Sequence, residues 1–272
     1  MDASFARPDP RVWIVVPCYD EERRLDTAAF EDYLRSHPDT GFIFVNDGSH
    51  DGTLSVLSGI RDHFPARAQV IDQQPNQGKA EAVRIGMLQA LDGGATYAGY
   101  FDADLATPLE AVDDFLAVLE KRDEIEFILG SRVKLMGRDI RRKATRHYLG
   151  RVFATAVSLA LDLPVYDTQC GAKVIRANGT TASLFETPFR SRWIFDVELI
   201  ARYLRLPVAP GEPPRRDRLY ELVLPAWHDR PGSKLAWYDF ARAMVELGYI
   251  WRERLAYRAG ATTAAAGVVR ES

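Results

Sequence analysis

Two aspartates, Asp102 and Asp104, stand in the segment FDADLATP, directly after the apolar run YAGYF and before a proline. Carboxylates at this spacing suit Mg²⁺ or Mn²⁺, hard cations that take oxygen ligands and often complete their coordination with water and substrate phosphates. Such a cation acts as a Lewis acid toward a departing phosphate group. The segment therefore predicts a divalent metal site, and an ordinary turn or helix N-cap is the competing interpretation.

Polar residues also follow two earlier apolar runs. FIFV leads into NDGSHDGT, where Asp47 can accept a hydrogen bond from a nucleobase N–H and glycines let the backbone approach a ligand. VVPCYDEE closes the first run with Pro17 and places the ring of Tyr19, on which a base could stack, near Glu21. The same residues fit a turn with a helix cap and an acidic pair that complements a helix dipole, so both interpretations stay open.

A fourth loop lies in NQGKAEAV, where Gly78 and Lys79 open a helix and would stand beside any bound phosphate. This loop lacks the flanking residues of a GxxxxGK[ST] motif, and no GxGxxG follows the first apolar run. Both absences weaken the interpretations as a phosphotransferase or a dinucleotide-dependent dehydrogenase.

These loops require a scaffold that brings strand ends together, and the chain alternates short apolar runs with helical patterns. Near-continuous apolar strands separated by helices indicate a mainly parallel sheet that is covered on both faces. The carboxyl ends of such strands meet in one crevice. We expect strands at 12–16, 42–46, 68–71, 97–102 and 127–131, and helices near 22–36, 52–63, 79–91 and 108–121.

The alternation changes after about residue 132. A basic segment, a helix near 147–162, a stretch around DTQCGAK without clear periodicity, a helix at 196–204, a strand YELVLP and a closing helix near 235–257 follow. We expect a single domain over 1–258 with two halves, at about 11–132 and about 133–258. The tail 259–272 is small, polar and unpatterned, which predicts disorder.

In this order, PCYDEE, VNDGSHDGT, NQGKAEAVRIG and DADLATP resemble the motifs of family 2 inverting glycosyltransferases. The resemblance implies an α/β fold of the GT-A type, a mainly parallel open sheet sandwiched by helices, with a Rossmann-like nucleotide-sugar-binding half and a helical extension on the acceptor side. It implies direct displacement with inversion at the anomeric carbon, and Mg²⁺ or Mn²⁺ held by Asp102 and Asp104. The implied contacts to the uridine-type donor are Pro17, Tyr19, Glu21, Asp47, Gly78, Lys79, Asp102, Ala103 and Asp104.

The second half narrows the resemblance. GSR, DTQCGAK, RWIFDVEL and WHDRPGSK are similar to segments of the dolichyl-phosphate β-glucosyltransferase branch, whose members move glucose from UDP-glucose to a polyprenyl phosphate. Members of that branch commonly carry a membrane-anchoring segment, and this sequence has no apolar run of about 18–20 residues. A peripheral enzyme and a different acceptor therefore both stay open.

The acceptor determines whether a general base is needed. A phosphate monoester is already anionic near neutral pH, because its second pKa is about 6, whereas an alcohol must lose a proton to a carboxylate. Asp196 and Glu198 in WIFDVEL, and Asp167 in DTQCGAK, are the candidate bases. Asp196 and Glu198 also fit a purely structural role as residues that cap and orient the helix 196–204.

Cationic side chains are needed for the acceptor phosphate and for the charge that develops on the leaving diphosphate. The ones within matching motifs are Arg132, Lys173, Arg192 and Lys234. The basic run RDIRRKATRHY at 138–148 favours contact with anionic headgroups over an ordinary solvated loop. The closing helix is rich in Trp and Tyr, which suits a membrane interface, but packing of an apolar stripe against the core is the favoured interpretation.

Composition sets the remaining bounds. The chain has 272 residues and a net charge of −3, which gives no general attraction to nucleic acid. Two distant cysteines form no disulfide framework, and the start lacks a signal peptide, so we expect a cytoplasmic protein that contacts a membrane only peripherally. The alternatives to transfer onto polyprenyl phosphate are transfer onto a hydroxyl, a nucleotide-sugar-binding module without catalysis, and a nucleotidyltransferase.

Overall fold

The computed structural model describes residues 10–141, 144–228 and 237–268, and side chains of 144–148, 237–240 and 258–268 are outside the description. Within these residues, seven strands form one sheet in the order β3-β2-β1-β4-β7-β5-β8, and β6 and β9 form a separate two-stranded sheet. The strands are β1 Val12–Cys18, β2 Thr40–Asp47, β3 Ala68–Gln73, β4 Tyr97–Phe101, β5 Phe127–Ser131, β6 Asp139–Arg141, β7 Ala172–Arg176, β8 Leu219–Val223 and β9 Ala226–His228.

The main sheet is parallel except at β7. Strands β1, β2, β3 and β4 pair in parallel, as do β5 and β8, while β7 lies antiparallel between β4 and β5. The carboxyl ends of the parallel strands therefore meet at one edge, as the sequence pattern predicts.

Alternating side chains of β1 show how the sheet buries both faces. Val12, Ile14 and Val16 belong to one apolar core, while Trp13 and Val15 belong to the other. A strand that is covered on both sides needs this nearly continuous apolar sequence, because successive side chains point to opposite faces.

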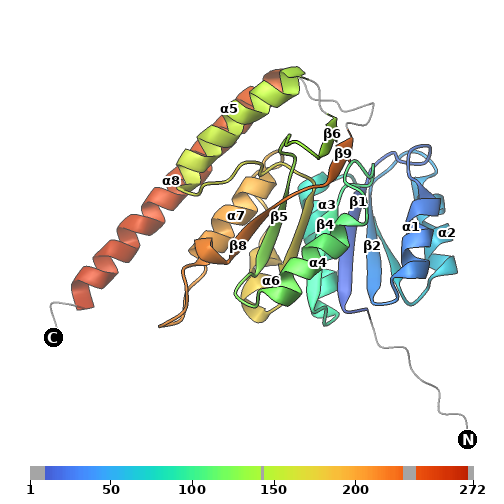
Figure 1. Cartoon of the computed structure of the whole chain (residues 1–272), viewed down its shortest axis with the longest axis horizontal. Helices are drawn as coiled ribbons and strands as arrows, with labels where there is room; N and C mark the ends of the chain where they lie inside the picture. Colours follow the sequence, from blue (N-terminus) through green and yellow to red (C-terminus); the bar gives the residue numbers. More distant parts are fainter. Residues whose placement is uncertain (1–9, 142–143, 229–236, 269–272) are drawn as a thin grey trace, which may run out of the picture.

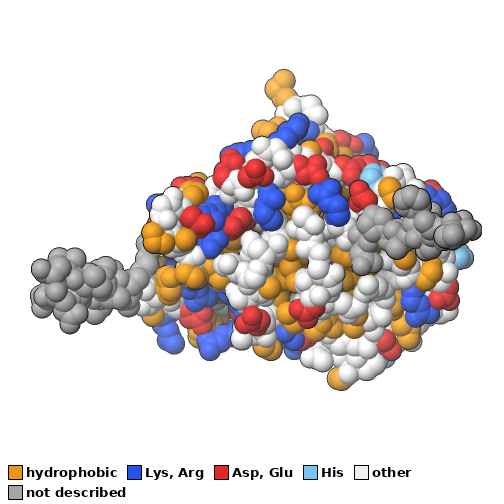
Figure 2. Space-filling view, turned by 90° about the horizontal axis from the view of Figure 1, so that it is seen from below, with side chains coloured by type: hydrophobic (Ala, Val, Ile, Leu, Met, Phe, Trp, Pro, Cys, Tyr) orange, Lys and Arg blue, Asp and Glu red, His pale blue; other side chains and the backbone are white. Residues whose placement is uncertain are grey.

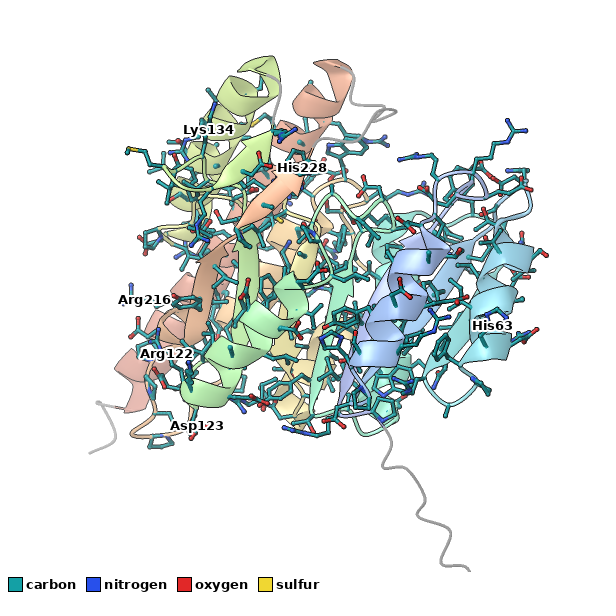
Figure 3. The ribbon with its side chains drawn as sticks, turned by 45° about the vertical axis from the view of Figure 1, so that its right-hand side comes forward. His63, Arg122, Asp123, Lys134, Arg216 and His228 are labelled. Carbon is teal, nitrogen blue, oxygen red and sulfur yellow. The ribbon has the colours of Figure 1, made fainter. Side chains whose placement is uncertain are left out.

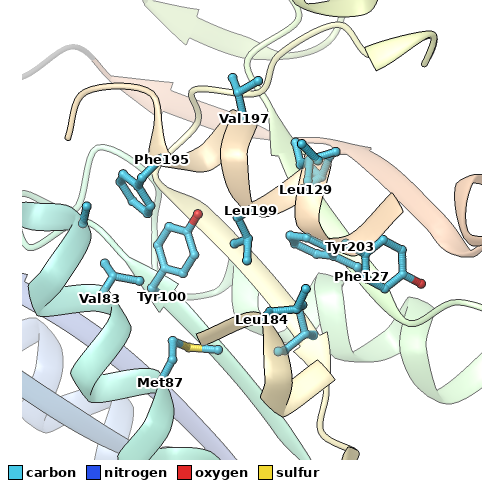
Figure 4. Close-up of a cluster of buried hydrophobic side chains, with 14 of the residues drawn as sticks. Val83, Met87, Tyr100, Phe127, Leu129, Leu184, Phe195, Val197, Leu199 and Tyr203 are labelled. Carbon is cyan, nitrogen blue, oxygen red and sulfur yellow. The ribbon is translucent and has the colours of Figure 1, made fainter. Parts of the chain in front are cut away.

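Helices form the two outer layers (Figure 1). Those on one face are α1 Thr27–Ser36, α2 Thr53–His63 and α4 Ala111–Lys121, and those on the other are α3 Lys79–Asp92, α6 Gly179–Glu186 and α7 Phe195–Arg205. Helices α5 Ala144–Leu161 and α8 Trp237–Val268 pack side by side, and α8 also contacts α7. Figure 4 shows the second face, where Tyr100 of β4 lies between Val83 of α3 and Phe195 of α7. In the described part of the chain, no helix is both long and apolar enough to cross a bilayer.

The observed fold confirms the predicted α/β class. In the first half, α1 begins at Thr27, five residues after the predicted start, and the larger differences lie in the second half. The stretch around DTQCGAK contains β7, and α6, β6 and β9 were also not predicted. Helix α8 continues to Val268, where the sequence pattern predicted disorder from residue 259; the run of alanines there favours helix. On the face seen in Figure 2, basic and acidic side chains are interspersed, unlike the basic stripe of a nucleic-acid-binding protein.

Candidate active site

A cavity of about 230 Å³ lies at the carboxyl ends of β1, β2 and β4, beside the first residue of α3. Eight of the nine residues predicted to contact a nucleotide-sugar line it, and the ninth, Gly78, directly precedes Lys79. The lining residues are Pro17, Cys18, Tyr19, Glu21, Asp47, Lys79, Asp102, Ala103 and Asp104. The structure thus brings together residues from four separate motifs, while their binding role remains a prediction.

The loop after β1 is fixed by the loop after β2. The backbone N–H of Glu21 donates to Oγ1 of Thr53 at 2.8 Å, and the N–H of His50 donates to Oδ1 of Asp20 at 2.8 Å. Tyr19 is 40% exposed, and its ring meets that of His50 edge-on. Its exposed ring therefore lies at the mouth of the cavity on a cross-linked loop, which suits stacking against a planar group.

Asp47 at the end of β2 organises the loop that precedes α3. Its Oδ1 accepts hydrogen bonds from Nε2 of Gln73 at 2.6 Å and from the N–H of Gln77 at 2.8 Å. Its Oδ2 accepts from the N–H of Gly78 at 2.8 Å. Gly78 has a φ of 96°, a conformation that favours glycine. Asp47 therefore fixes the backbone from which the Lys79 side chain extends, a role that sequence reasoning did not assign to it.

The two aspartates of FDADLATP follow β4. The N–H of Asp102 donates to the carbonyl oxygen of Gly171 at 3.0 Å, which joins the end of β4 to the start of β7. Its Oδ1 forms an ion pair with Nζ of Lys79. Oδ1 of Asp104 accepts from the N–H of Ala106 at 3.0 Å. A methyl group at position 171 would overlap the Asp102 carboxylate, so glycine is required there by close approach.

Two carboxyl groups of the cavity, those of Asp104 and Glu21, have a raised pKa. Burial raises the pKa of Asp104, and the charge of Asp102 raises it further. Burial also raises the pKa of Glu21; Arg24 opposes this effect, and Asp104 adds to it. Burial opposes the charge on Lys79, but Asp102 and Asp196 together raise the pKa of its ammonium group. The site is therefore an acidic cluster that attracts a cation.

A divalent cation fits this donor set. Within the described residues, no group of three or more His, Cys, Asp or Glu side chains could hold a metal with protein ligands alone. Mg²⁺ and similar ions commonly take one or two carboxylates and complete their coordination with phosphate oxygens and water. Oε2 of Glu21 is buried, accepts no hydrogen bond from the described residues and lies 3.6 Å from Nε of Arg24, so the cavity also holds a carboxylate oxygen with no close donor. The donor set of Asp102 and Asp104 therefore fits the predicted metal–diphosphate site, and their role as metal ligands remains a prediction.

Asp196, a candidate base, lies in the first turn of α7 and is 5% exposed. Its Oδ1 accepts hydrogen bonds from Nζ of Lys173 at 2.5 Å and from the hydroxyl of Tyr100. Lys173 is 1% exposed and also donates to the carbonyl oxygen of Cys170 at 2.7 Å. Burial and then the Asp196 charge raise the pKa of Tyr100, which keeps its hydroxyl protonated. The carboxylate is thus held by two buried donors.

The other two candidate bases are also bound by donors. Glu198 accepts from the N–H of Ser191 at 2.8 Å and from Nη2 of Arg202 at 2.8 Å. Asp167 accepts from Nε of Arg132 at 2.6 Å and from Nη2 of Arg132 at 2.8 Å, a two-pronged ion pair. None of the three candidate bases, Asp196 included, is among the residues that line the cavity. Glu198 orders the segment before α7, and Asp167 orders Arg132.

The four cations predicted to bind phosphate occupy different positions. Lys173 is instead buried as the counter-ion of Asp196, so in this arrangement it does not reach an acceptor. Arg132 pairs with Asp167 and lies 5.2 Å from the Trp227 ring. Arg192 is exposed and its Nη2 donates to the carbonyl oxygen of Gln77 at 3.1 Å, which places it beside the Lys79 loop. Lys234 lies outside the described residues.

A larger cavity of about 310 Å³ lies between the ends of α5 and α7 and the middle of α8. Arg216, one of its lining residues, lies toward the amino ends of the strands, away from His228 and Lys134 (Figure 3). Two arginines that line this cavity donate hydrogen bonds to backbone carbonyl oxygens of helices: Arg254 to that of Ala160 at 2.8 Å and Arg205 to that of Ala201 at 3.2 Å. We therefore place the chemistry in the smaller, acidic cavity.

Sequence reasoning missed two residues that shape the site. Gly171 gives the Asp102 carboxylate its space, and Glu221 of β8 accepts from the N–H of Asp167 at 2.7 Å and of Tyr166 at 2.8 Å. Burial raises the pKa of Glu221 despite these bonds. A lone acidic residue in the apolar strand YELVLP was the available signal, since a buried carboxylate needs donors.

Comparison with known proteins agrees with this geometry. The family model described as "Glycosyl transferase family 2" matches residues 13–180. The dolichyl-phosphate beta-glucosyltransferase of Drosophila melanogaster is 32% identical over 268 residues, which cover 90% of this chain and 75% of the relative. The protein of the same name from Mus musculus is 31% identical, with 93% of this chain and 78% of the relative covered.

Solved structures support the same fold at lower sequence identity. Glucosyl-3-phosphoglycerate synthase from Mycobacterium tuberculosis, in complex with UDP, aligns with a TM-score of 0.61 at 16% identity, over 89% of this chain and 79% of that chain. Its complex with Mn²⁺, UDP-glucose and phosphoglyceric acid aligns with a TM-score of 0.56 at 18% identity, over 90% and 77% of the two chains.

Proposed function

The chain belongs to glycosyl transferase family 2, among relatives of the dolichyl-phosphate β-glucosyltransferases, and we propose that it transfers glucose from UDP-glucose to a polyprenyl phosphate of the dolichyl type. The names of its relatives supply the sugar and the acceptor class. The acidic cavity at the strand ends supports a nucleotide-diphospho-sugar as donor.

The donor is bound through its diphosphate and its base. Asp102 and Asp104 would hold Mg²⁺ or Mn²⁺, which when bound neutralises charge on the leaving diphosphate. Asp47 and the exposed ring of Tyr19 lie where a uracil would meet a hydrogen-bond acceptor and a stacking surface. Arg192 lies beside the same loop as Lys79, so both cations face the diphosphate side.

The transfer is a single displacement. An acceptor phosphate oxygen forms a bond to the anomeric carbon while the bond from that carbon to the diphosphate oxygen breaks, and UDP leaves with the electron pair. Attack from the face opposite to UDP inverts the anomeric configuration. The reaction needs no proton transfer from the nucleophile when that nucleophile is a phosphate oxygen.

The observation that carries the choice of acceptor is the state of the three candidate bases. Asp196 is held by Lys173 and Tyr100, and Asp167 is held by Arg132. Glu198 is held by Ser191 and Arg202. A carboxylate whose oxygens already accept hydrogen bonds from such donors must lose one of those bonds before it can take a proton from an acceptor hydroxyl. An acceptor that is already anionic fits this site, whereas a hydroxyl acceptor would need one of these carboxylates to be released.

Peripheral membrane contact would bring the enzyme to such an acceptor. Helices α5 and α8 pack beside each other and leave apolar side chains exposed (Figure 1). These side chains, between 50% and 76% exposed, are Leu149, Val152, Leu159, Val245, Tyr249 and Trp251. Trp and Tyr are enriched where proteins meet the lipid interface. Vesicle flotation tests this contact. Trp251→Ser should reduce binding to the vesicles, whereas Leu54→Ser on α2 should not. Absence of binding by the unsubstituted protein, or equal binding by it and both variants, would contradict the membrane contact.

The proposed reaction is tested by incubating purified protein with Mn²⁺ or Mg²⁺, a panel of UDP- and GDP-sugars, and polyprenyl phosphate, polyprenol or water. We expect UDP release and a glucosyl-lipid product with UDP-glucose and polyprenyl phosphate, both abolished by Asp102→Asn. Product with hydroxyl acceptors alone would replace the phosphate acceptor by the hydroxyl one. UDP-sugar binding without turnover on any acceptor would indicate a binding module.

A further inference from the structure

Lys79 is the first residue of α3, and its ammonium group pairs with Oδ1 of Asp102. Asp102 is one of the two carboxylates assigned to the metal, so a side chain of this protein occupies part of the place that a divalent cation needs. The two side chains are 40% and 37% exposed, so the pair lies at the wall of the open cavity and not in the core.

The backbone beneath Lys79 is fixed, while its head group is free to move. Asp47 accepts hydrogen bonds from the N–H groups of Gln77 and Gly78, each at 2.8 Å, and Arg192 donates to the carbonyl oxygen of Gln77. The four-carbon stem of a lysine can swing its ammonium group over several ångströms by rotamer changes alone. Lys79 can therefore leave Asp102 without any movement of α3.

A second anionic partner for Lys79 arrives with the nucleotide. Helix α3 presents Lys79 at its N-terminus, where unpaired N–H groups and the helix dipole favour a phosphate. A diphosphate at the Asp102 side of the cavity would lie within the sweep of this side chain. With the diphosphate bound, the ammonium group can pair with either the Asp102 carboxylate or the phosphate oxygens. Without it, the ammonium group pairs with the carboxylate.

We propose that Lys79 acts as a built-in counter-ion for the Asp102–Asp104 pair, which it releases to the divalent cation when a nucleotide diphosphate binds. The proposal rests on the proposed function, because it takes the cation and diphosphate as ligands of this cavity. Without the diphosphate, a divalent cation must approach a carboxylate that already carries an ammonium group, and the two positive charges repel. With it, the ammonium group moves to the phosphates and the repulsion is relieved.

Lys79 is thus a positioning residue that couples two ligands. Coupling of binding is reciprocal, so the factor by which UDP strengthens cation binding equals the factor by which the cation strengthens UDP binding. Removal of the ammonium group should raise the affinity for the cation alone and lower this shared factor. A lysine that merely binds phosphate would lower UDP affinity and leave the affinity for the cation alone unchanged.

The test measures free and bound Mn²⁺ by electron paramagnetic resonance, with and without UDP, and UDP binding in EDTA by calorimetry. Lys79→Met keeps an unbranched side chain that is shorter by one atom and removes the charge, and Lys79→Arg keeps the charge. Lys121→Met, at the exposed end of α4, is the matched control for loss of one positive charge. Thermal unfolding of each variant verifies that it is folded.

We expect Lys79→Met to bind Mn²⁺ alone roughly 5- to 150-fold more tightly, the usual range of one coupling, and to show a smaller strengthening by UDP. Lys79→Arg should keep the weak affinity for Mn²⁺ alone because it keeps the positive charge, and Lys121→Met should behave like the unsubstituted protein. Unchanged affinity of folded Lys79→Met for Mn²⁺ alone would overturn the inference but leave the proposed function standing. An unsubstituted protein that binds neither Mn²⁺ nor UDP would overturn both.

Discussion

Replacing Gly171 by alanine should displace the Asp102 carboxylate and so disable the metal–diphosphate site. The added methyl group would overlap both oxygens of Asp102, whereas the backbone of residue 171 is outside the left-handed region and accepts alanine. Asp102 is itself held to the carbonyl oxygen of Gly171, so the strain cannot be relieved by moving one residue alone. The side chain of Asp102 must turn, or β4 and β7 must separate.

The expected size of the effect follows from these two outcomes. Overpacking in a rigid region costs about 1–3 kcal/mol of stability. Misplacement of a positioning group by about 1 Å can lower the rate about 100-fold. We therefore expect kcat/KM of Gly171→Ala to fall about 100-fold and its affinity for Mn²⁺ in the presence of UDP to fall with it, in protein that remains folded.

Two glycines serve as controls. Gly41→Ala would bring a methyl group within 2.7 Å of the Trp13 ring at the far end of β2, so it should lose stability but keep kcat/KM. Gly59→Ala in α2 meets no atom within 4 Å and should be neutral or stabilising by about 0.5–1 kcal/mol. Urea unfolding and steady-state UDP release measure the two quantities separately. Full activity and unchanged Mn²⁺ affinity in Gly171→Ala would refute the assignment of Asp102 to the metal.

Three further outcomes are expected. Lys173→Met should cost about 3–5 kcal/mol because it leaves the buried Asp196 carboxylate without its cation, and the double variant with Asp196→Leu should recover most of that loss in urea unfolding. Asp104→Asn should abolish metal-dependent turnover yet stabilise the ligand-free protein by about 0.5–2 kcal/mol. Burial and the charge of Asp102 raise the pKa of Asp104 above its usual value of 3.8, so the native state keeps this proton to a higher pH than the unfolded state does. The free energy of unfolding therefore falls as the pH rises from the usual pKa to the raised one, and Asp104→Asn should lose this pH dependence. Cys18 and Cys170 should resist a thiol reagent until the protein unfolds, since burial raises the pKa of both thiols, that of Cys170 to about 11.

Periodicity was sufficient to find the strands of the first half, because β1, β2 and β4 each contain an uninterrupted apolar run. The predicted start of α3 at residue 79 agrees with the structure, since Gly78 marks the boundary. Strand β7 was missed because AKVIR contains Lys173, and a lysine in a short run predicts a loop. The burial of Lys173 depends on its ion pair with Asp196, 23 residues later in the chain, and such a partner cannot be identified from local sequence.

The residues that line the cavity could be predicted from their types and motifs. The availability of the candidate bases could not, because it depends on which donors bind each carboxylate. Residues 47, 102 and 104 face one cavity, as the order of their motifs indicates. Whether a carboxylate is available depends on which donors reach it, and these donors come from other elements. Asp167 is bound by Arg132, which lies 35 residues away, so the sequence could not reveal that this candidate base is occupied.

The antiparallel direction of β7 explains why Gly171, which sequence reasoning missed, precedes a strand and does not follow one. In a parallel sheet, the residues that reach the crevice follow the carboxyl ends of the strands. Strand β7 runs the other way between β4 and β5, so its amino end lies at that edge, and Gly171 stands beside Asp102. Lys173, the second residue of β7, therefore lies near the same edge of the sheet, and its ammonium group donates to Asp196. A search for site residues in a mixed sheet should thus include the residues before each antiparallel strand, and DTQCGAK contributes to this site for that reason.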